Sequence, residues 1–186
     1  GTALAMWWAP AIGKAASGVG AVIMWATEQQ PFVMGIVVSV VIGIALTLPI
    51  SSAAICAALS LTGLAGGAAV AGCCAQMVGF AVLSFKENRW GGLVSQGLGT
   101  SMLQMGNILK NPRIWLPAIL TSAVTGPLAT CVFRLEMNGP AVSSGMGTCG
   151  LVGPIGIDTA MGGGAAMWTG IAVVCFLAPA ILTWIF

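Results

Sequence analysis

Long uncharged stretches, broken at a few points by charged side chains, dominate the pattern of this chain. Between Glu28 and Lys86 lie 57 residues without a charge. A helix needs about 20 residues to cross the hydrocarbon core of a bilayer, so this stretch predicts two crossings, at 32–48 and 65–85. The sequence L-P-I-S-S at 48–52 interrupts the helix between them.

Two more uncharged stretches follow, and each predicts a further crossing. The first, 114–133, contains Pro117 and Pro127, so we expect a kinked helix there. The second is 165–186, with a tryptophan near each end where interfacial aromatics are expected. Residues 3–27 also carry tryptophan and one lysine, and we interpret them as an interfacial or partial crossing.

Segment 90–109 does not have the pattern of a simple crossing. It is uncharged but amphipathic, and two basic residues flank it on each side: Lys86, Arg89, Lys110 and Arg113. The positive-inside rule puts both flanks on the cytoplasmic side. We therefore expect the segment to dip into the membrane and return, or to lie on its surface. An ordinary crossing helix is the alternative.

Segment 137–157 is rich in residues that break helices, with six glycines and two prolines. Irregular backbone is tolerated at membrane depth only where protein or a water-filled cavity surrounds it. The segment is therefore expected to form a re-entrant loop.

Small residues recur at intervals of four along the first two predicted crossings. One set is Gly35, Ser39, Gly43 and Thr47; the other is Gly63, Gly67, Ala71, Ala75 and Gly79. Such faces let helix backbones approach closely. These faces predict a tight bundle or a dimer core. The alternative is that they line a transport path.

The composition supports a membrane protein. Of 186 residues only 5% are charged, and the mean hydropathy is +1.03, whereas a soluble domain has roughly 25% charged residues. A soluble globular domain, a disordered tail and a nucleic-acid binder are excluded. We expect an all-α, polytopic transmembrane helical bundle with broken helices and one or two re-entrant segments. Residues 1–186 form a single transmembrane domain, expected to be a fragment without its N-terminal helices because residue 1 is Gly.

Several chemistries are absent from the sequence. The chain has no His, so it has no imidazole base, no His phosphocarrier and no His metal ligand. Its six Cys form no C-x-x-C motif and are interpreted as small buried side chains. No Walker A motif, Rossmann fingerprint or nucleophile elbow is present. We expect no catalytic residue, no metal and no cofactor.

Ionisable groups beside apolar sequence are costly and are therefore candidates for function. Glu136 opens the glycine-rich segment, and its carboxylate with the amide of Asn138 is suited to sugar hydroxyls. The backbone at Gly147 and Thr148 would supply further N–H and C=O groups, and Asp158 lies at the exit of the segment. The alternative for Glu136 is a boundary charge that pairs with the neighbouring arginine.

Uncharged polar residues inside the apolar stretches are the other candidates. Ser51 and Ser52 would cap a half-helix that points into the protein, as in secondary transporters, or would cap a connecting loop. A buried amide must find a partner, so Gln76 either bonds another helix or contacts the solute. The same alternatives hold for Gln104 and Asn107 in the dipping segment.

Longer motifs make the chain resemble a known family. They are T-L-P-I-S-S-A-A (47–54), A-G-C-C-A-Q-M-V-G-F-A-V-L-S-F-K-E-N (71–88), Q-G-L-G-T-S-M-L-Q (96–104), N-I-L-K-N-P-R-I-W-L-P (107–117), T-G-P-L-A-T-C-V-F-R-L-E (125–136) and G-M-G-T-C-G-L-V-G (145–153). The chain is similar, over nearly its whole length, to type-2 EIIC components of the bacterial sugar phosphotransferase system. That family includes the perfringolysin O regulatory protein.

The resemblance implies a permease that carries a sugar across the bacterial inner membrane while a partner EIIB, served by EIIA, phosphorylates it. The phosphorylated Cys or His belongs to the partner, so this chain is at most the membrane subunit of a phosphotransferase. By analogy, a Glu next to a re-entrant hairpin binds sugar hydroxyls, and Glu136 is the best match. Better-known EIIC proteins often have a His in the site, which this chain lacks.

The sequence leaves three functions open. The first is a permease of alternating access for a small polar solute, which the resemblance implies is a sugar, acting as a homodimer in the lipid bilayer. The second is a membrane regulator that senses a ligand without transporting it and signals through the basic residues around 90–109. The third is transport of a solute other than a sugar.

Overall fold

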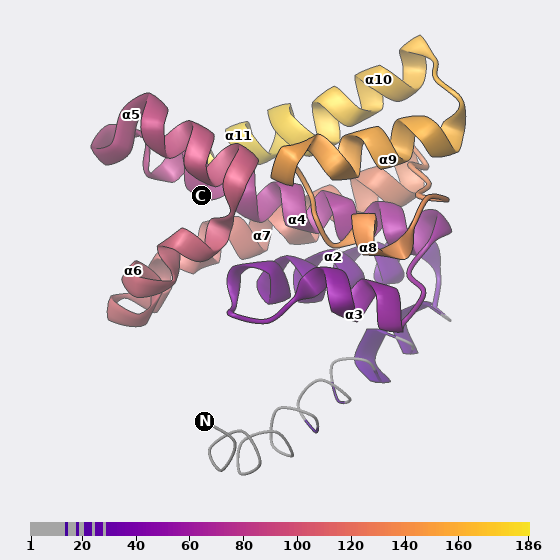
Figure 1. Cartoon of the computed structure of the whole chain (residues 1–186), viewed down its shortest axis with the longest axis horizontal. Coiled ribbons are helices and arrows are strands. Elements are labelled where there is room, and N and C mark those ends of the chain that lie inside the picture. Colours follow the sequence, from indigo (N-terminus) through magenta and orange to yellow (C-terminus); the bar gives the residue numbers. More distant parts are fainter. Residues whose placement is uncertain (1–13, 15–17, 19–20, 24, 28) are drawn as a thin grey trace.

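The described part of the protein, residues 14, 18, 21–23, 25–27 and 29–186 of a computed structural model, is a bundle of helices without strands (Figure 1). Its α-helices are, in chain order, α2 (Pro31–Thr47), α3 (Ser52–Ala58), α4 (Gly63–Leu83), α5 (Phe85–Val94), α6 (Met105–Lys110), α7 (Leu116–Pro127), α8 (Ala141–Ser144), α9 (Val152–Met161), α10 (Ala165–Ile171) and α11 (Ala178–Ile185). The 3₁₀ and π turns are η1 (Ser95–Gly99), η2 (Ser101–Gln104), η3 (Pro112–Trp115), η4 (Leu128–Val132), η5 (Cys149–Leu151) and η6 (Ala172–Leu177). The all-α prediction is confirmed. Most of segment 3–27, and Glu28, lie outside the described residues.

Four long helical units form the body of the bundle. Three are long and apolar enough to span a membrane: Gly63–Leu83, Pro112–Val132 and Ala165–Ile185. The fourth is α2, whose 17 residues extend about 25 Å. All four agree with the predicted crossings to within two residues at each end. Helix α4 lies at the centre and packs against α2, α7 and α11.

The prolines of these helices lie mainly at helix ends and do not kink the helices in the middle. Pro31 is at the first turn of α2, where its missing N–H costs nothing. Pro117 has the same role in α7 instead of kinking it. Pro127 ends the α-helical turns of α7, and the chain continues in the π turns of η4. The α-helical part of this crossing is therefore interrupted at Pro127 and not at Pro117.

Glycines bring the backbones of α2, α4 and α7 into direct contact. A β-carbon on Gly72 would overlap the carbonyl group of Ser39, and one on Gly126 would overlap the carbonyl oxygen of Gly35. A β-carbon on Gly43 would lie 2.8 Å from the carbonyl oxygen of Gly72. Only glycine fits such crossings, so the prediction of close packing through small residues is confirmed within one chain.

Segment 90–110 forms a hairpin, here called the first hairpin, that enters the bundle and returns to the end at which it started (Figure 1). Arg89 turns the chain inward with φ 50° and ψ −143°, outside the helical region. The inward arm ends with η1, Thr100 is extended, and η2 with α6 forms the outward arm. The dip-and-return prediction for 90–109 is confirmed.

Residues 141–161 form a second hairpin, which enters from the opposite end of the bundle (Figure 1). Its glycine-rich tip packs on the backbone of α4, since a β-carbon on Gly147 would lie 2.8 Å from the carbonyl carbon of Cys73. The tip is irregular as predicted, but the returning arm is the regular helix α9, with Pro154 in its first turn. Pro154 needs no N–H partner at that position, which explains why the helix forms.

The tips of the two hairpins meet beside α4. Thr148 of the second hairpin donates its hydroxyl to the carbonyl oxygen of Gly97 in the first, at 2.5 Å. The same hydroxyl lies 3.5 Å from the sulfur of Met77 in α4. Two segments that enter from opposite ends of the bundle therefore close against each other in its interior.

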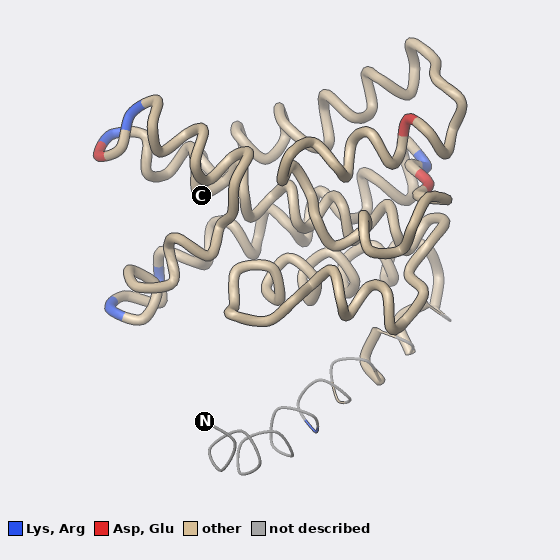
Figure 2. Tube along the Cα trace, viewed as in Figure 1, with Lys and Arg blue, Asp and Glu red and all other residues tan. Residues whose placement is uncertain are grey.

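Apart from Lys14 on the N-terminal segment, the charged residues of the described part lie at the two ends of the bundle, and the middle is uncharged (Figure 2). One end carries Lys86, Glu87, Arg89, Lys110 and Arg113, and the other carries Arg134, Glu136 and Asp158. The positive-inside rule predicts that the first end, called here the basic end, faces the cytoplasm. On this prediction, the axis that joins the two ends runs along the membrane normal.

We expect a membrane-impermeant amine reagent to modify both Lys86 and Lys110 in inside-out vesicles and neither in right-side-out vesicles. The two lysines are exposed and lie on either side of the first hairpin, at the same end of the bundle. Site-resolved mass spectrometry of the unmutated protein measures both. Modification of the two lysines from opposite sides would contradict the hairpin. Modification of both lysines in right-side-out vesicles would show that the basic end faces the outside.

Candidate solute-binding site

A cavity of about 720 Å³ lies at the basic end, between the C-terminal turn of α4, the α5 turn, α6 and the start of α7. Its floor is apolar because Phe80, Ile114 and Pro117 line it, and Phe80 packs with Ile108 and Ala118 beneath. Ligand pockets in proteins commonly enclose roughly 300–1,000 Å³. The volume therefore suits a small molecule.

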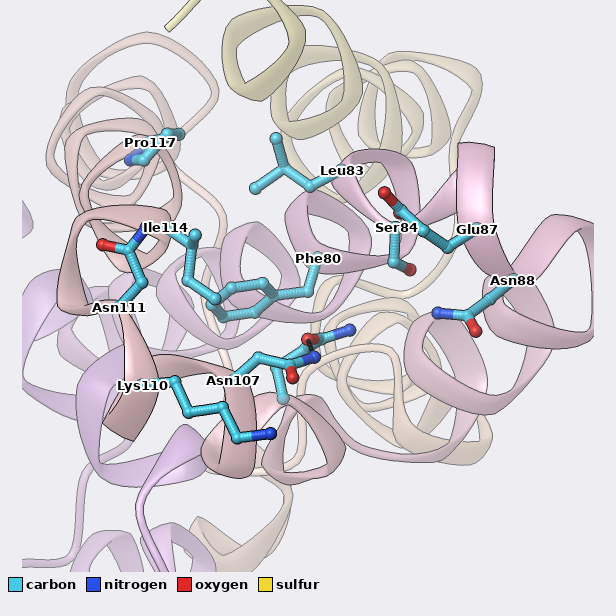
Figure 3. Close-up of a pocket in the computed structure, with 11 residues that line it drawn as sticks. Phe80, Leu83, Ser84, Glu87, Asn88, Asn107, Lys110, Asn111, Ile114 and Pro117 are labelled. Atoms are coloured by element: carbon cyan, nitrogen blue, oxygen red, sulfur yellow. Dashed lines mark hydrogen bonds between the residues drawn. The ribbon is translucent and has the colours of Figure 1, made fainter.

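The walls of this cavity are polar. Figure 3 shows the ring of Phe80 in the centre, with Glu87 and Asn88 on one side and Asn111 and Lys110 across from them. The wall residues that bear polar side chains are Ser84, Glu87, Asn88, Gln104, Asn107, Lys110 and Asn111. An apolar floor with amides, one carboxylate and one ammonium group around it fits a neutral solute with several hydroxyl groups, since amides both donate and accept hydrogen bonds.

A network of buried hydrogen bonds supports the floor from below. Gln76, one turn before Phe80 on α4, accepts from the indole N–H of Trp115 at 2.9 Å and from Thr47 Oγ1 at 3.3 Å. The amide nitrogen of Gln76 donates to Ser122 Oγ at 3.2 Å. Thr47 is also 2.9 Å from Ser101 Oγ at the tip of the first hairpin. The network therefore ties α2, α4, α7 and this hairpin together.

The structure brings two of the predicted site residues into the cavity. Gln104 and Asn107 both line it, and Asn107 Nδ2 donates to Gln104 Oε1 at 2.8 Å. Gln76 lies beneath the floor with its amide groups bonded to protein. Gln76 therefore forms the interhelical hydrogen bonds that were one of its two predicted alternatives.

Glu136, Asn138 and Asp158 lie at the other end of the bundle (Figure 2). Met137 pairs with Gly63 at the start of α4, whereas the cavity begins at Phe80. At 1.5 Å per residue these two points are about 25 Å apart along the helix. Asn138 Nδ2 lies 3.5 Å from Glu136 Oε2, and neither residue lines the cavity.

The remaining predicted residues hold the hairpins. Ser51 accepts from the backbone N–H of Ala54 at 3.1 Å and caps α3. Ser52 donates to the carbonyl oxygen of Gly145 at 2.7 Å, which fixes the second hairpin on α3. Gly147 and Thr148 form the tip of that hairpin and contact α4 and the first hairpin.

The sequence analysis missed Glu87, Asn88 and Asn111 as cavity residues. They belong to the motifs K-E-N at 86–88 and N-I-L-K-N at 107–111, which flank the dipping segment. From the sequence, Lys110 is interpreted as a determinant of topology or as part of a signalling surface, not as a cavity residue. The polar residues on both flanks of the re-entrant segment could have indicated this site, because a hairpin brings its two flanks close together.

A comparison with known protein families identifies the class of this protein. The family model described as "Phosphotransferase system, EIIC" matches residues 1–186. The chain belongs to this EIIC family. No curated protein and no solved structure matches it significantly.

EIIC components are the membrane permeases of the phosphotransferase system, which transports sugars together with EIIB and EIIA subunits. The apolar helices and the charge distribution of this EIIC chain fit that role. The predicted resemblance and membrane location are confirmed.

Proposed function

We propose that this EIIC chain is a permease for a neutral, polyhydroxylated solute, a sugar, in the bacterial inner membrane. The cavity at the basic end is the solute site in its inward-open state. The observation that carries the proposal is the combination of an apolar floor at Phe80 with amide and carboxylate walls in a volume of about 720 Å³.

Within the site, Gln104 and Asn107 exchange hydrogen bonds with solute hydroxyls, and the carboxylate of Glu87 accepts from them. Asn107 and Glu87 are exposed to the cavity, whereas Gln104 is held by its neighbours. A hydrogen bond to a charged group contributes about 1.5–3 kcal/mol, more than a bond between neutral groups. We therefore expect Glu87 to contribute most to affinity.

The solute path leads from this cavity past the hairpin tips to the end that carries Glu136, Asn138 and Asp158. Gly147 and Thr148 lie on that path, at the contact with Gly97. Glu136 and Asn138 then contact the solute at the outer mouth. Ser51, Ser52 and Gln76 hold the hairpins and the helices around the path.

The phosphorylating EIIB partner approaches the basic end, where the cavity opens. A homodimer in the membrane remains part of the proposal. The exposed apolar residues of α10 and α11, among them Trp168 and Ile181, face outward from the bundle and are available to lipid or to a second subunit.

The test is uptake of labelled sugars and polyols by the full-length protein in proteoliposomes, with and without phosphorylated EIIB. We expect Glu87→Gln to raise the half-saturating concentration of the transported solute about 10-fold or more, because it removes a charged acceptor. Lys86→Gln is the matched control, since Lys86 is exposed beside Glu87 but does not line the cavity. Absence of uptake by folded, unmutated protein would refute the permease.

A further inference from the structure

A second cavity, of about 510 Å³, adjoins the first within the first hairpin. Gly92, Ser95 and Gln96 of the inward arm and Leu103 of the outward arm line it. It is called here the hairpin compartment, and the cavity of about 720 Å³ is called the main compartment. Asn88, Gln104 and Asn107 line both.

A chain of hydrogen-bonded amides contributes to the walls of both compartments. Gln104 Nε2 donates to Gln96 Oε1 at 3.0 Å, and Gln96 Nε2 donates to Ser84 Oγ at 2.9 Å. Asn107 donates to Gln104 at 2.8 Å, so the donors follow one another in a single direction. Gln96 and Gln104 are buried, which fixes the chain, whereas Asn107 at its end is exposed.

The amides of this chain have hydrogen-bonding groups left over. A primary amide offers two N–H donors and an oxygen with two lone pairs. Asn107 uses one N–H, and Gln104 uses one N–H and one lone pair. Each of these two amides therefore keeps at least one free N–H donor and one free oxygen lone pair. The two groups lie side by side and can bind two neighbouring hydroxyl groups, one as acceptor and one as donor. Because Gln104 and Asn107 line both cavities, these groups are available from either compartment.

We propose that the hairpin compartment is a second saccharide subsite, and that the solute consists of two linked polyhydroxylated rings, a disaccharide. One ring occupies the main compartment above Phe80, and the other lies between the arms of the first hairpin. The link passes over Asn107, the exposed end of the amide chain. This inference rests on the sugar site proposed above and adds the size of the solute and a second set of contacts.

Equilibrium binding to the purified full-length protein tests the inference, with labelled hexoses and the disaccharides built from them as probes. We expect at least one disaccharide to bind about 10-fold or more tightly than each of its hexoses. Ser95→Phe places a bulky ring in the hairpin compartment and should remove this advantage while hexose binding stays within about twofold. Val94→Phe is the matched control, because Val94 is the 54% exposed neighbour of Ser95 and lines neither compartment.

The outcomes separate this inference from the proposed function. Saturable hexose binding without any preference for a disaccharide would overturn the second subsite and leave the permease intact. A disaccharide preference that survives Ser95→Phe in a folded protein would overturn it as well. A protein that binds no saccharide would contradict the proposed sugar site, and the second subsite with it.

Discussion

Gly72→Leu is expected to destabilise the bundle strongly. The backbone of α4 at Gly72 touches the backbone of α2 at Ser39, and no rotamer can relieve an overlap with a carbonyl group. Overpacking a core costs about 1–3 kcal/mol or more, and backbone contacts lie at the upper end because whole helices must separate. We expect the melting temperature to fall by about 10 °C or more, which follows from about 3 kcal/mol in a chain of this size.

Gly106→Leu is the matched control for this substitution. Gly106 lies on the exposed α6, and a β-carbon there would meet no heavy atom within 4 Å. Thermal unfolding and size-exclusion profiles in the same detergent compare the two variants. Equal stability of Gly72→Leu and Gly106→Leu would contradict the close approach of α2 and α4.

Gln76→Leu should have the second largest effect, through the network below the cavity floor. Leucine has nearly the same volume, so the loss is one of hydrogen bonds. Trp115 loses the acceptor for its indole N–H, and an unsatisfied buried group costs about 1–3 kcal/mol. Ser122 and Thr47 keep other partners, at Ala118 and Ser101 respectively.

A double-mutant cycle with Trp115→Phe isolates this contact. Because Trp115→Phe removes the same bond, the double variant should be about as stable as Gln76→Leu alone, and the two losses should not add. Chemical denaturation in detergent gives the three free energies of unfolding. If the two losses of unfolding free energy add, Gln76 and Trp115 act independently, which would contradict the 2.9 Å hydrogen bond between them.

The crossings could be predicted from the sequence because each rests on a local pattern of apolar length between charges. The return of the first hairpin was also predictable, since Lys86, Arg89, Lys110 and Arg113 fix both flanks to one side by their own charge. Neither prediction depends on which other helices each segment contacts. The cavity differs, because its walls come from α4, α5, α6 and α7, and their convergence depends on the packing of the whole bundle.

The predicted glycine face shows this limit in detail. An α-helix turns 100° per residue, so a stripe at intervals of four rotates by about 40° at each step. Gly67 therefore meets Leu135, whereas Gly79 meets Thr183 on α11. Gly72, which is not part of the stripe, makes the contact with α2. The pattern predicted close packing correctly but not the partner of each residue.

The contact between Thr148 and Gly97 has a kinetic consequence. A solute that moves between the two ends of the bundle must pass a point where both hairpins close against α4. Passage then requires a movement of helices, which in proteins takes roughly microseconds to milliseconds. Flux through this chain should therefore saturate with solute concentration and rise steeply with temperature, as in a carrier, instead of growing linearly as through an open pore.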